Sequence, residues 1–114
     1  MKIWLDDLRP APPGWTWIKD AEEAVRYLGD FYVTDISLDH DLGDDYDPDY
    51  TLYNTGYDVA KWIEEQTAEN HNYFPPRIFV HTDNPVGRAN IQQAINKIRL
   101  LIADRYWEWI TPPR

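Results

Sequence analysis

Short apolar runs separated by polar segments divide the chain into alternating strands and helices. Four runs have the length and composition of strands, at residues 2–5, 15–18, 35–38 and 77–80. After each of the last three, apolar residues recur at helical spacing, over residues 21–28, 59–66 and 89–101. Strands that alternate with helices predict the α/β class, here as one small three-layer domain with a mostly parallel central sheet.

Capping and turn residues set the expected boundaries of these elements. Asp20, with Glu23 three residues later, predicts the start of the first helix, and Thr55 precedes the second. Residues 44–54 are rich in Asp, Tyr and Pro and predict a loop. The tail at residues 106–110 fits either a last short strand or an apolar strap, and the sequence leaves both open.

The composition is typical of a folded domain from a reducing compartment. The chain has 114 residues, of which 43% are hydrophobic, which is enough for one domain with its own core. It has no cysteine, which excludes disulfides, thiolate nucleophiles and zinc ribbons. No signal peptide pattern is present, and no apolar run approaches the roughly 20 residues of a membrane span. We therefore expect a cytoplasmic protein that does not contact membranes.

The acidic charge is concentrated in one stretch of the chain. The net charge is -9, and residues 30–58 contain nine Asp and no Lys or Arg. Such a belt repels a nucleic-acid backbone, so broad, sequence-independent binding of DNA or RNA is disfavoured. A small anionic ligand can still bind where a metal or nearby arginines reverse the field. For the acids at positions 44, 45, 47 and 49, a solvated loop that serves solubility is an equally good interpretation.

Two clusters of carboxylates follow predicted strands. Asp6 and Asp7 come directly after the first strand, and Asp39 and Asp41 follow the third. The carboxyl ends of parallel strands meet at one edge of a sheet, where open α/β folds bind their ligands. Acids are rarely buried without partners, so the two clusters predict a cation or a protonated group between them.

Four ordered motifs resemble a known family. They read WLDDLRPAP, SLDHDLG, TGYDVAKWI and PPRIFVHTDNPVGRANI, and together they resemble the cyclic-phosphate processing receiver-like domains of bacteria and phages, relatives of the response-regulator receiver with its flavodoxin-like fold. The resemblance reaches about Leu101. It implies a single domain over residues 1–114, with a shared core at 1–103, an extra insert at 45–54 and a C-terminal extension at 104–114.

The resemblance also implies roles for the residues at the strand ends. Asp6 and Asp7 match the receiver's Mg²⁺-binding acid pair, Asp39 matches the phosphoacceptor, and Thr82 stands where receivers carry Ser or Thr. The receiver's lysine has no match, because the four lysines, at 2, 19, 61 and 97, do not follow a late strand. The expected metal ligands are Asp6, Asp7 and Asp39 for Mg²⁺ or Mn²⁺; the expected catalytic residues are His81, Asp39, His40 and Asp41; the expected substrate-binding residues are Arg9, Thr82, Asn84 and Arg88.

The two histidines change the chemistry expected of a receiver. An imidazole titrates near neutral pH and can give a proton to a leaving alkoxide. If the segment around His40 is extended, its side chain points away from Asp39, so we expect His40 to support the acids. His81 follows a buried strand and is expected to be the proton donor. Four tryptophans, at positions 4, 15, 17 and 62, are expected in the core rather than on a base-stacking surface.

These residues predict a metal-assisted phosphodiesterase that opens a cyclic phosphate. A cyclic nucleotide, a cyclic dinucleotide signal and an RNA end with a 2',3'-cyclic phosphate all present the same bond, so the substrate stays open. A metal-free variant of this reaction, with His81 and His40 as acid and base, stays open. Two alternatives of another class remain: a non-catalytic receiver phosphorylated on Asp39, and a module that sequesters a cyclic nucleotide. The sequence leaves the oligomeric state undetermined.

Overall fold

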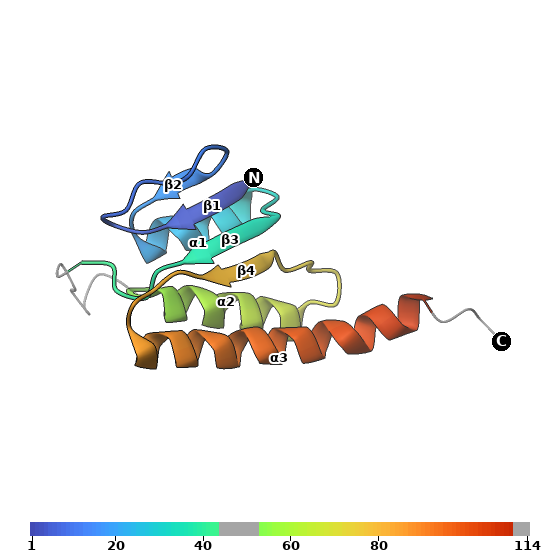
Figure 1. The fold of residues 1–114 in the computed structure, drawn as a ribbon. Helices are drawn as coiled ribbons and strands as arrows, with labels where there is room; N and C mark the ends of the chain where they lie inside the picture. Colours follow the sequence, from blue (N-terminus) through green and yellow to red (C-terminus); the bar gives the residue numbers. More distant parts are fainter. Residues whose placement is uncertain (44–52, 111–114) are drawn as a thin grey trace.

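Four parallel strands form the sheet, in the order β2-β1-β3-β4 (Figure 1). They are β1 (Lys2–Leu5), β2 (Thr16–Ile18), β3 (Asp35–Leu38) and β4 (Arg77–Val80). The computed structural model describes residues 1–43 and 53–110, with side chains described up to residue 105. The predicted loop at 44–54 and its acids therefore lie almost wholly outside the described residues. The α/β class and the parallel sheet expected of a receiver-like fold are confirmed.

Three helices accompany the sheet, and the first two begin where the capping residues predict. Helix α1 (Ala21–Asp30) starts after Asp20, whose carboxylate accepts the backbone N–H of Glu23 at 2.7 Å. Helix α2 (Gly56–Glu69) starts after Thr55, and the Thr55 and Asp58 side chains form a reciprocal capping box. The cap satisfies backbone donors that the first turn leaves unpaired.

Helix α3 (Pro85–Ile110) is longer than the sequence indicated. It runs through residues 106–110, so neither the strand nor the strap expected there is formed. The reason is that no glycine or proline interrupts the segment after Gly87 until Pro112. Arg105, 8% exposed, donates hydrogen bonds to the carbonyl oxygens of Thr67 and Tyr73 and ties α3 to the end of α2.

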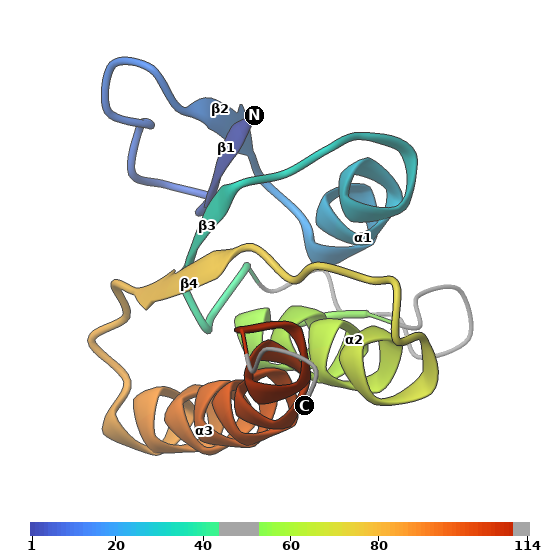
Figure 2. The ribbon, with the colours of Figure 1, turned by 90° about the vertical axis from the view of Figure 1, so that its right-hand side faces the viewer.

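The hydrophobic core lies on one face of the sheet. In-register pairing puts Ile3 beside Ile36, and Leu5 beside both Leu38 and Ile18, and all five side chains are buried. They pack in one cluster with apolar residues of all three helices, among them Ala24, Leu28, Val59, Ile63, Ile91 and Ile95. Figure 2 shows α1 and α2 on the same side of the sheet, with α3 below β4.

The opposite face carries no helix among the residues that the structure describes. The residues that point to this helix-free face are Lys2, Trp4, Trp17, Asp35, Ser37, Arg77 and Phe79. The third layer expected from the sequence is thus missing there, because the β1–β2 connection contains three prolines and Gly14 and does not form a helix. Trp15 from this connection contacts Trp4 and Phe79 instead.

The expectation that the four tryptophans lie in the core is wrong for three of them. Trp4 and Trp15 are half-buried outside the core cluster, and Trp17 is 38% exposed. Side chains alternate between the two faces of a strand. Because Ile3, Leu5 and Ile18 face the helices, their neighbours Trp4 and Trp17 point to the opposite face. Trp62 does pack against the core.

None of the helices in the described part of the chain is long and apolar enough to span a membrane.

Candidate functional site

Three site residues meet because the ladder of the sheet continues one residue past each strand. The backbone N–H groups of Asp6, Asp39 and His81 each donate to a carbonyl oxygen on the neighbouring strand at 3.0 Å. Each of them follows a strand residue on the core face. By the alternation of extended chain, their side chains therefore lie on the side of the helix-free face, at the carboxyl edge.

Three carboxylates form a cluster at this edge. One oxygen each from Asp6, Asp7 and Asp39 lies within 4.8 Å of the others. Hard oxygen ligands of this kind suit Mg²⁺ or Mn²⁺. The structure thus brings together the three residues expected to hold a metal. Gly43, with φ of +90°, passes close to Asp7: a Cβ there would stand 3.2 Å from its Oδ2.

The Asp6 carboxylate is fully buried and densely hydrogen-bonded. Its Oδ1 accepts the backbone N–H groups of Leu8 and Arg9, both at 2.8 Å. Its Oδ2 lies 3.1 Å from His81 Nε2 and 3.3 Å from Arg9 Nε. Burial raises the pKa of Asp6, but these amide and imidazole hydrogen bonds outweigh it and hold the pKa below the usual 3.8. Asp6 is therefore ionised.

Asp39 differs from Asp6 although the two lie close together. Burial raises the pKa of Asp39, and the neighbouring charge of Asp6 adds to the rise. Hydrogen bonds from the Thr82 side chain and from the His40 backbone oppose the shift without cancelling it. A nearby cation would stabilise the charged form of a carboxyl group whose pKa is raised in this way. Asp39 therefore fits the role of a metal ligand.

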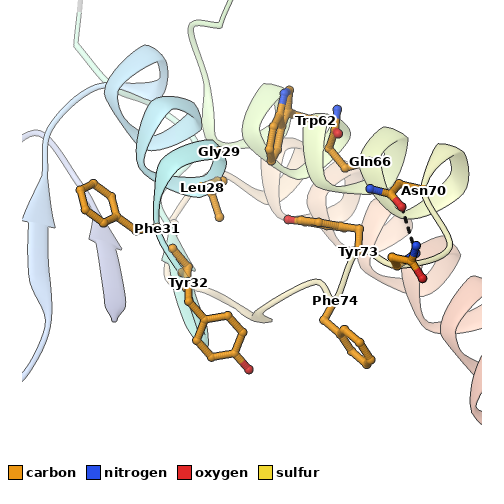
Figure 3. Close-up of a pocket in the computed structure, with 11 residues that line it drawn as sticks. Leu28, Gly29, Phe31, Tyr32, Trp62, Gln66, Asn70, Tyr73 and Phe74 are labelled. Carbon is orange, nitrogen blue, oxygen red and sulfur yellow. Dashed lines mark hydrogen bonds between the residues drawn. The ribbon is translucent and has the colours of Figure 1, made fainter.

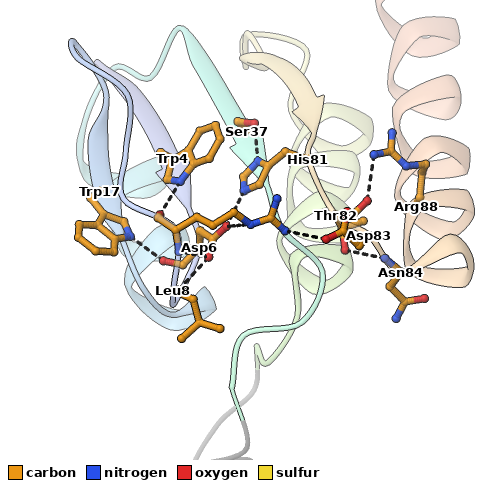
Figure 4. Close-up of polar contacts among 11 residues, drawn as sticks. Trp4, Asp6, Leu8, Trp17, Ser37, His81, Thr82, Asp83, Asn84 and Arg88 are labelled. Carbon is orange, nitrogen blue, oxygen red and sulfur yellow. Dashed lines mark hydrogen bonds and ion pairs between the residues drawn. The ribbon is translucent and has the colours of Figure 1, made fainter.

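His81 is fixed in orientation by three contacts (Figure 4). Its ring stacks on Trp4 with 3.8 Å between centroids and 5° between planes. Nδ1 lies 2.7 Å from Ser37 Oγ, and Nε2 faces Asp6. Since an ionised carboxylate only accepts, Nε2 carries the proton in the neutral ring and Ser37 donates to Nδ1. Burial lowers the pKa of His81 below 6.5, against the opposing effect of Asp6.

Three supporting residues escaped the sequence analysis. Ser37 was treated only as part of a strand, and Trp4 and Trp17 were expected in the core. The indole N–H of Trp17 donates to the carbonyl of Asp6 at 2.7 Å, and that of Trp4 donates to the carbonyl of Arg9 at 2.9 Å. Their position opposite the core residues of the same strands is the signal that could have revealed them.

Arg9 is an exposed cation beside the carboxylates. Its side chain, 48% exposed, contacts Asp6 through Nε and Asp83 through Nη2 at 3.5 Å. The Asp83 carboxylate is almost fully exposed, so its hold on Arg9 is weak. A guanidinium in this position can turn to an incoming phosphate.

The remaining predicted substrate-binding residues shape the loop that leads into α3. Thr82 is buried, and its hydroxyl accepts the backbone N–H of Asn84 at 3.2 Å. Asn84 Oδ1 accepts the backbone N–H of Gly87 at 3.0 Å. Arg88 Nη2 donates to the carbonyl of Thr82 at 2.9 Å. These polar groups therefore already have partners within the protein.

His40 and Asp41 lie beside the start of α3. His40 Nδ1 is 3.0 Å from Asp41 Oδ1, and the exposed Asp41 carboxylate accepts from Asn84 Nδ2 at 3.3 Å. The His40 ring packs so closely on Gly87 that a Cβ there would overlap it. His40 thus links two loops and contacts neither His81 nor Asp6 in the described interactions, and its expected role of supporting the acids stays a prediction.

Gly56 explains the TGYD motif at the start of α2. Its backbone N–H donates to the carbonyl of His40 at 3.1 Å. A Cβ on Gly56 would overlap the backbone carbonyl of Asp39. The first turn of α2 therefore needs glycine to approach the end of β3, and this contact fixes the backbone that carries Asp39.

A cavity of about 400 Å³ lies away from the carboxylates, at the C-terminal ends of α1 and α2 (Figure 3). Its walls include Phe31, Tyr32, Trp62, Tyr73 and the amide side chains of Gln66 and Asn70. The described residues of this cavity contain no charged side chain. It therefore lacks the acid–base groups that the carboxyl edge provides.

Comparison with known protein families identifies the family of the chain. A family model described as the cyclic-phosphate processing Receiver domain matches residues 1–97. The match spans every strand, α1, α2 and the first half of α3. No curated protein and no solved structure matches the chain.

Proposed function

Because the chain belongs to the cyclic-phosphate processing receiver domain family, we propose that its carboxyl-edge site hydrolyses a cyclic phosphodiester in a metal-assisted reaction. The family description gives the class of ligand, a cyclic phosphate. The proposal adds the reaction: water attacks phosphorus, one ring P–O bond breaks, and the leaving ribose oxygen takes a proton.

The proposal depends on one observation: three carboxylates, an imidazole and an exposed guanidinium lie close together at the carboxyl edge of the sheet. The carboxylate oxygens of Asp6, Asp7 and Asp39 lie within 4.8 Å of each other, and His81 Nε2 lies 3.1 Å from Asp6. Phosphoester hydrolysis needs a neutralising charge, an activated water and a proton donor. These groups offer all three.

The carboxylate cluster would hold Mg²⁺ or Mn²⁺. A cation bound there would polarise a phosphoryl oxygen and lower the pKa of a bound water. The raised pKa of Asp39 supports this, because the burial of its charge beside Asp6 is otherwise poorly compensated. Arg9 would neutralise the non-bridging oxygens of the phosphate from the solvent side.

His81 is the proposed proton donor to the leaving oxygen. Nε2 faces the carboxylates and carries a proton in either state of the ring. Burial lowers the pKa of His81 below 6.5, and the negative charges of Asp6 and Asp39 oppose this shift without cancelling it. Ser37 Oγ can accept a hydrogen bond from Nδ1 of the imidazolium as readily as it donates one to the neutral ring, since a hydroxyl does both. Trp4 holds the plane of the ring in either state.

A receiver that stores a phosphoryl group on Asp39 is the weaker alternative. It requires an ammonium at the site, whereas Lys61 and Lys97 pair with Glu64 on the helices. Lys2 begins β1 at the amino edge, and Lys19 lies over the ring of Trp17. Sequestration of a cyclic phosphate without turnover uses the same groups as hydrolysis and is separated from it only by experiment.

The proposal is tested by incubating the protein with cyclic mononucleotides, cyclic dinucleotides and RNA ending in a 2',3'-cyclic phosphate, with Mg²⁺, Mn²⁺ or chelator. We expect a product heavier by one water, formed only with metal. Recovery of unchanged but protein-bound ligand would replace hydrolysis by sequestration. Turnover in chelator equal to that with metal would remove the cation from the mechanism.

A further inference from the structure

Aromatic rings are exposed on the helix-free face of the sheet. Trp17 on β2 is 38% exposed and Phe79 on β4 is 46% exposed. Trp4 and Trp15 lie between them, and Trp15 meets both Trp4 and Phe79 edge-on with 6.3 Å between centroids. The rings thus form a row across the sheet rather than a closed core.

The cations of this face contrast with the acidic charge of the whole chain. Lys2 Nζ lies 5.6 Å from the Trp15 ring centroid, and Lys19 Nζ lies 4.4 Å from that of Trp17. The Arg77 side chain is exposed and pairs with Asp35. Three cations and one acid, Asp35, therefore border the rings on a protein of net charge -9, and this local excess of positive charge complements a polyanion.

The row of rings is continuous with the candidate site. Trp4 stacks on His81, and Trp17 donates to the carbonyl of Asp6. A chain of nucleotides whose terminal phosphate reaches the carboxylates would therefore pass over exposed aromatic rings and their neighbouring cations. Aromatic rings with interspersed basic side chains are the usual means of holding unpaired bases.

We propose that the helix-free face binds the unpaired bases of a single-stranded RNA, so that the cyclic phosphate processed at the carboxyl edge is the end of an oligonucleotide. The part of this inference that concerns the phosphate rests on the proposed function, whereas base binding by the rings does not. Phe79 and Trp17 stack on bases, and Lys2 and Lys19 contact the backbone phosphates.

Binding is measured with a labelled single-stranded RNA of about six nucleotides and a plain 3'-hydroxyl end, by fluorescence anisotropy. Phe79→Ala is expected to weaken binding about tenfold, the loss of one stacked base, and Phe79→Trp is expected to restore it. Lys2→Gln is expected to weaken binding and reduce its salt dependence. Tyr32→Ala, which removes an exposed ring that lines the cavity at the ends of α1 and α2 instead of this face, is the matched control and should bind as wild type.

Four results would overturn the inference. The first two are that the wild type does not bind the RNA, or that it binds duplex RNA equally well. The other two are that both Phe79→Ala and Lys2→Gln bind as wild type, or that Tyr32→Ala loses as much affinity as Phe79→Ala. A wild-type dimer that Phe79→Ala converts to monomer would assign the face to a second copy of the chain, again against the inference. Lys2→Gln keeps the test valid if Phe79→Ala fails to fold.

Turnover separates this inference from the proposed function. Phe79→Ala should lower kcat/KM about tenfold for RNA with a 2',3'-cyclic phosphate and leave that for a cyclic mononucleotide unchanged. If the protein binds RNA but turns over no cyclic phosphate, the RNA-binding role of the helix-free face stands and the proposed hydrolysis is refuted. Equal kcat/KM for wild type and Phe79→Ala on the RNA would refute the surface as a substrate site and leave hydrolysis intact.

Discussion

Asp6 and Asp39 are neighbours whose environments shift their pKa values in opposite directions. Asp6 accepts two backbone amides and contacts His81 and Arg9, so its charge is well compensated. Asp39 is buried beside that charge with fewer donors, and its pKa is raised. Pairs of acids whose pKa values are driven apart are typical of catalytic sites. The difference also makes Asp39 the residue whose replacement is most informative.

Without metal, Asp39→Asn should raise the melting temperature by a few degrees, because it removes a buried charge next to Asp6. With Mn²⁺ added, the wild type should gain stability through binding to the folded state, and the variant should gain much less. Asp41→Asn, on an exposed acid outside the cluster, is the control and should keep the metal response. A thermal shift in Mn²⁺ equal for all three proteins would refute the assigned ligands.

The two histidines should differ in their effect on turnover. His81→Ala should lower kcat at least about 100-fold, the usual contribution of a general acid, while the thermal shift with Mn²⁺ remains. His40→Ala should lower kcat less, because His40 contacts Asp41 and Gly87 rather than Asp6. Steady-state kinetics of both folded variants test this, and a larger loss in His40→Ala would reverse the assignment.

At the scale of elements, two glycines in helices should respond to substitution in opposite ways. Gly56→Ala should destabilise the protein by about 2 kcal/mol, because the new Cβ would overlap the Asp39 carbonyl and force α2 away from β3. Gly29→Ala in α1, where a Cβ meets nothing within 4 Å, should be neutral or stabilise by up to about 1 kcal/mol. Urea denaturation gives both values. Equal effects would contradict the close approach at Gly56.

Local patterns predicted the elements well where one residue decides the structure. Asp20 and Thr55 cap helices because their side chains satisfy backbone donors nearby, which requires no knowledge of the rest of the fold. The extent of α3 was missed, because the aromatic tail was interpreted as a strand or a strap although no glycine or proline ends the helix before Pro112. Ser37 was missed for a similar reason: a serine within a strand becomes notable only when His81, distant in sequence, lies beside it.

For the whole molecule, the sequence predicted the sheet and the meeting of the acids but not which face stays open. Strand-end acids converge in any parallel sheet, so Asp6, Asp7 and Asp39 could be grouped in advance. The distribution of helices depends on crossovers, and the proline-rich β1–β2 connection left one face without a helix. Tryptophans that the composition assigned to a core consequently lie beside the site.

Stability without metal should fall as the pH is lowered from about 7 to 5. The pKa of His81 is below its usual 6.5, so the unfolded chain binds this proton more readily, and the contribution of the neutral ring is lost as the pH falls through that window. Asp6, with a pKa below 3.8, adds a further loss at more acidic pH, whereas protonation of Asp39 acts in the opposite direction. Urea denaturation of wild type and His81→Gln in chelator tests this. The free energy of unfolding of the variant should change less between pH 7 and 5 than that of the wild type. A larger change in the variant would contradict a buried neutral imidazole.

The central claim, that the carboxyl-edge site adds water to a cyclic phosphate, is tested most directly by running the reaction in oxygen-18 water with Mn²⁺. The account predicts one oxygen-18 atom on the phosphorus of the ring-opened product for the wild type, and almost none formed by Asp39→Asn in the same time. Cyclic phosphates returned intact by the wild type, or opened equally fast by Asp39→Asn, would contradict it.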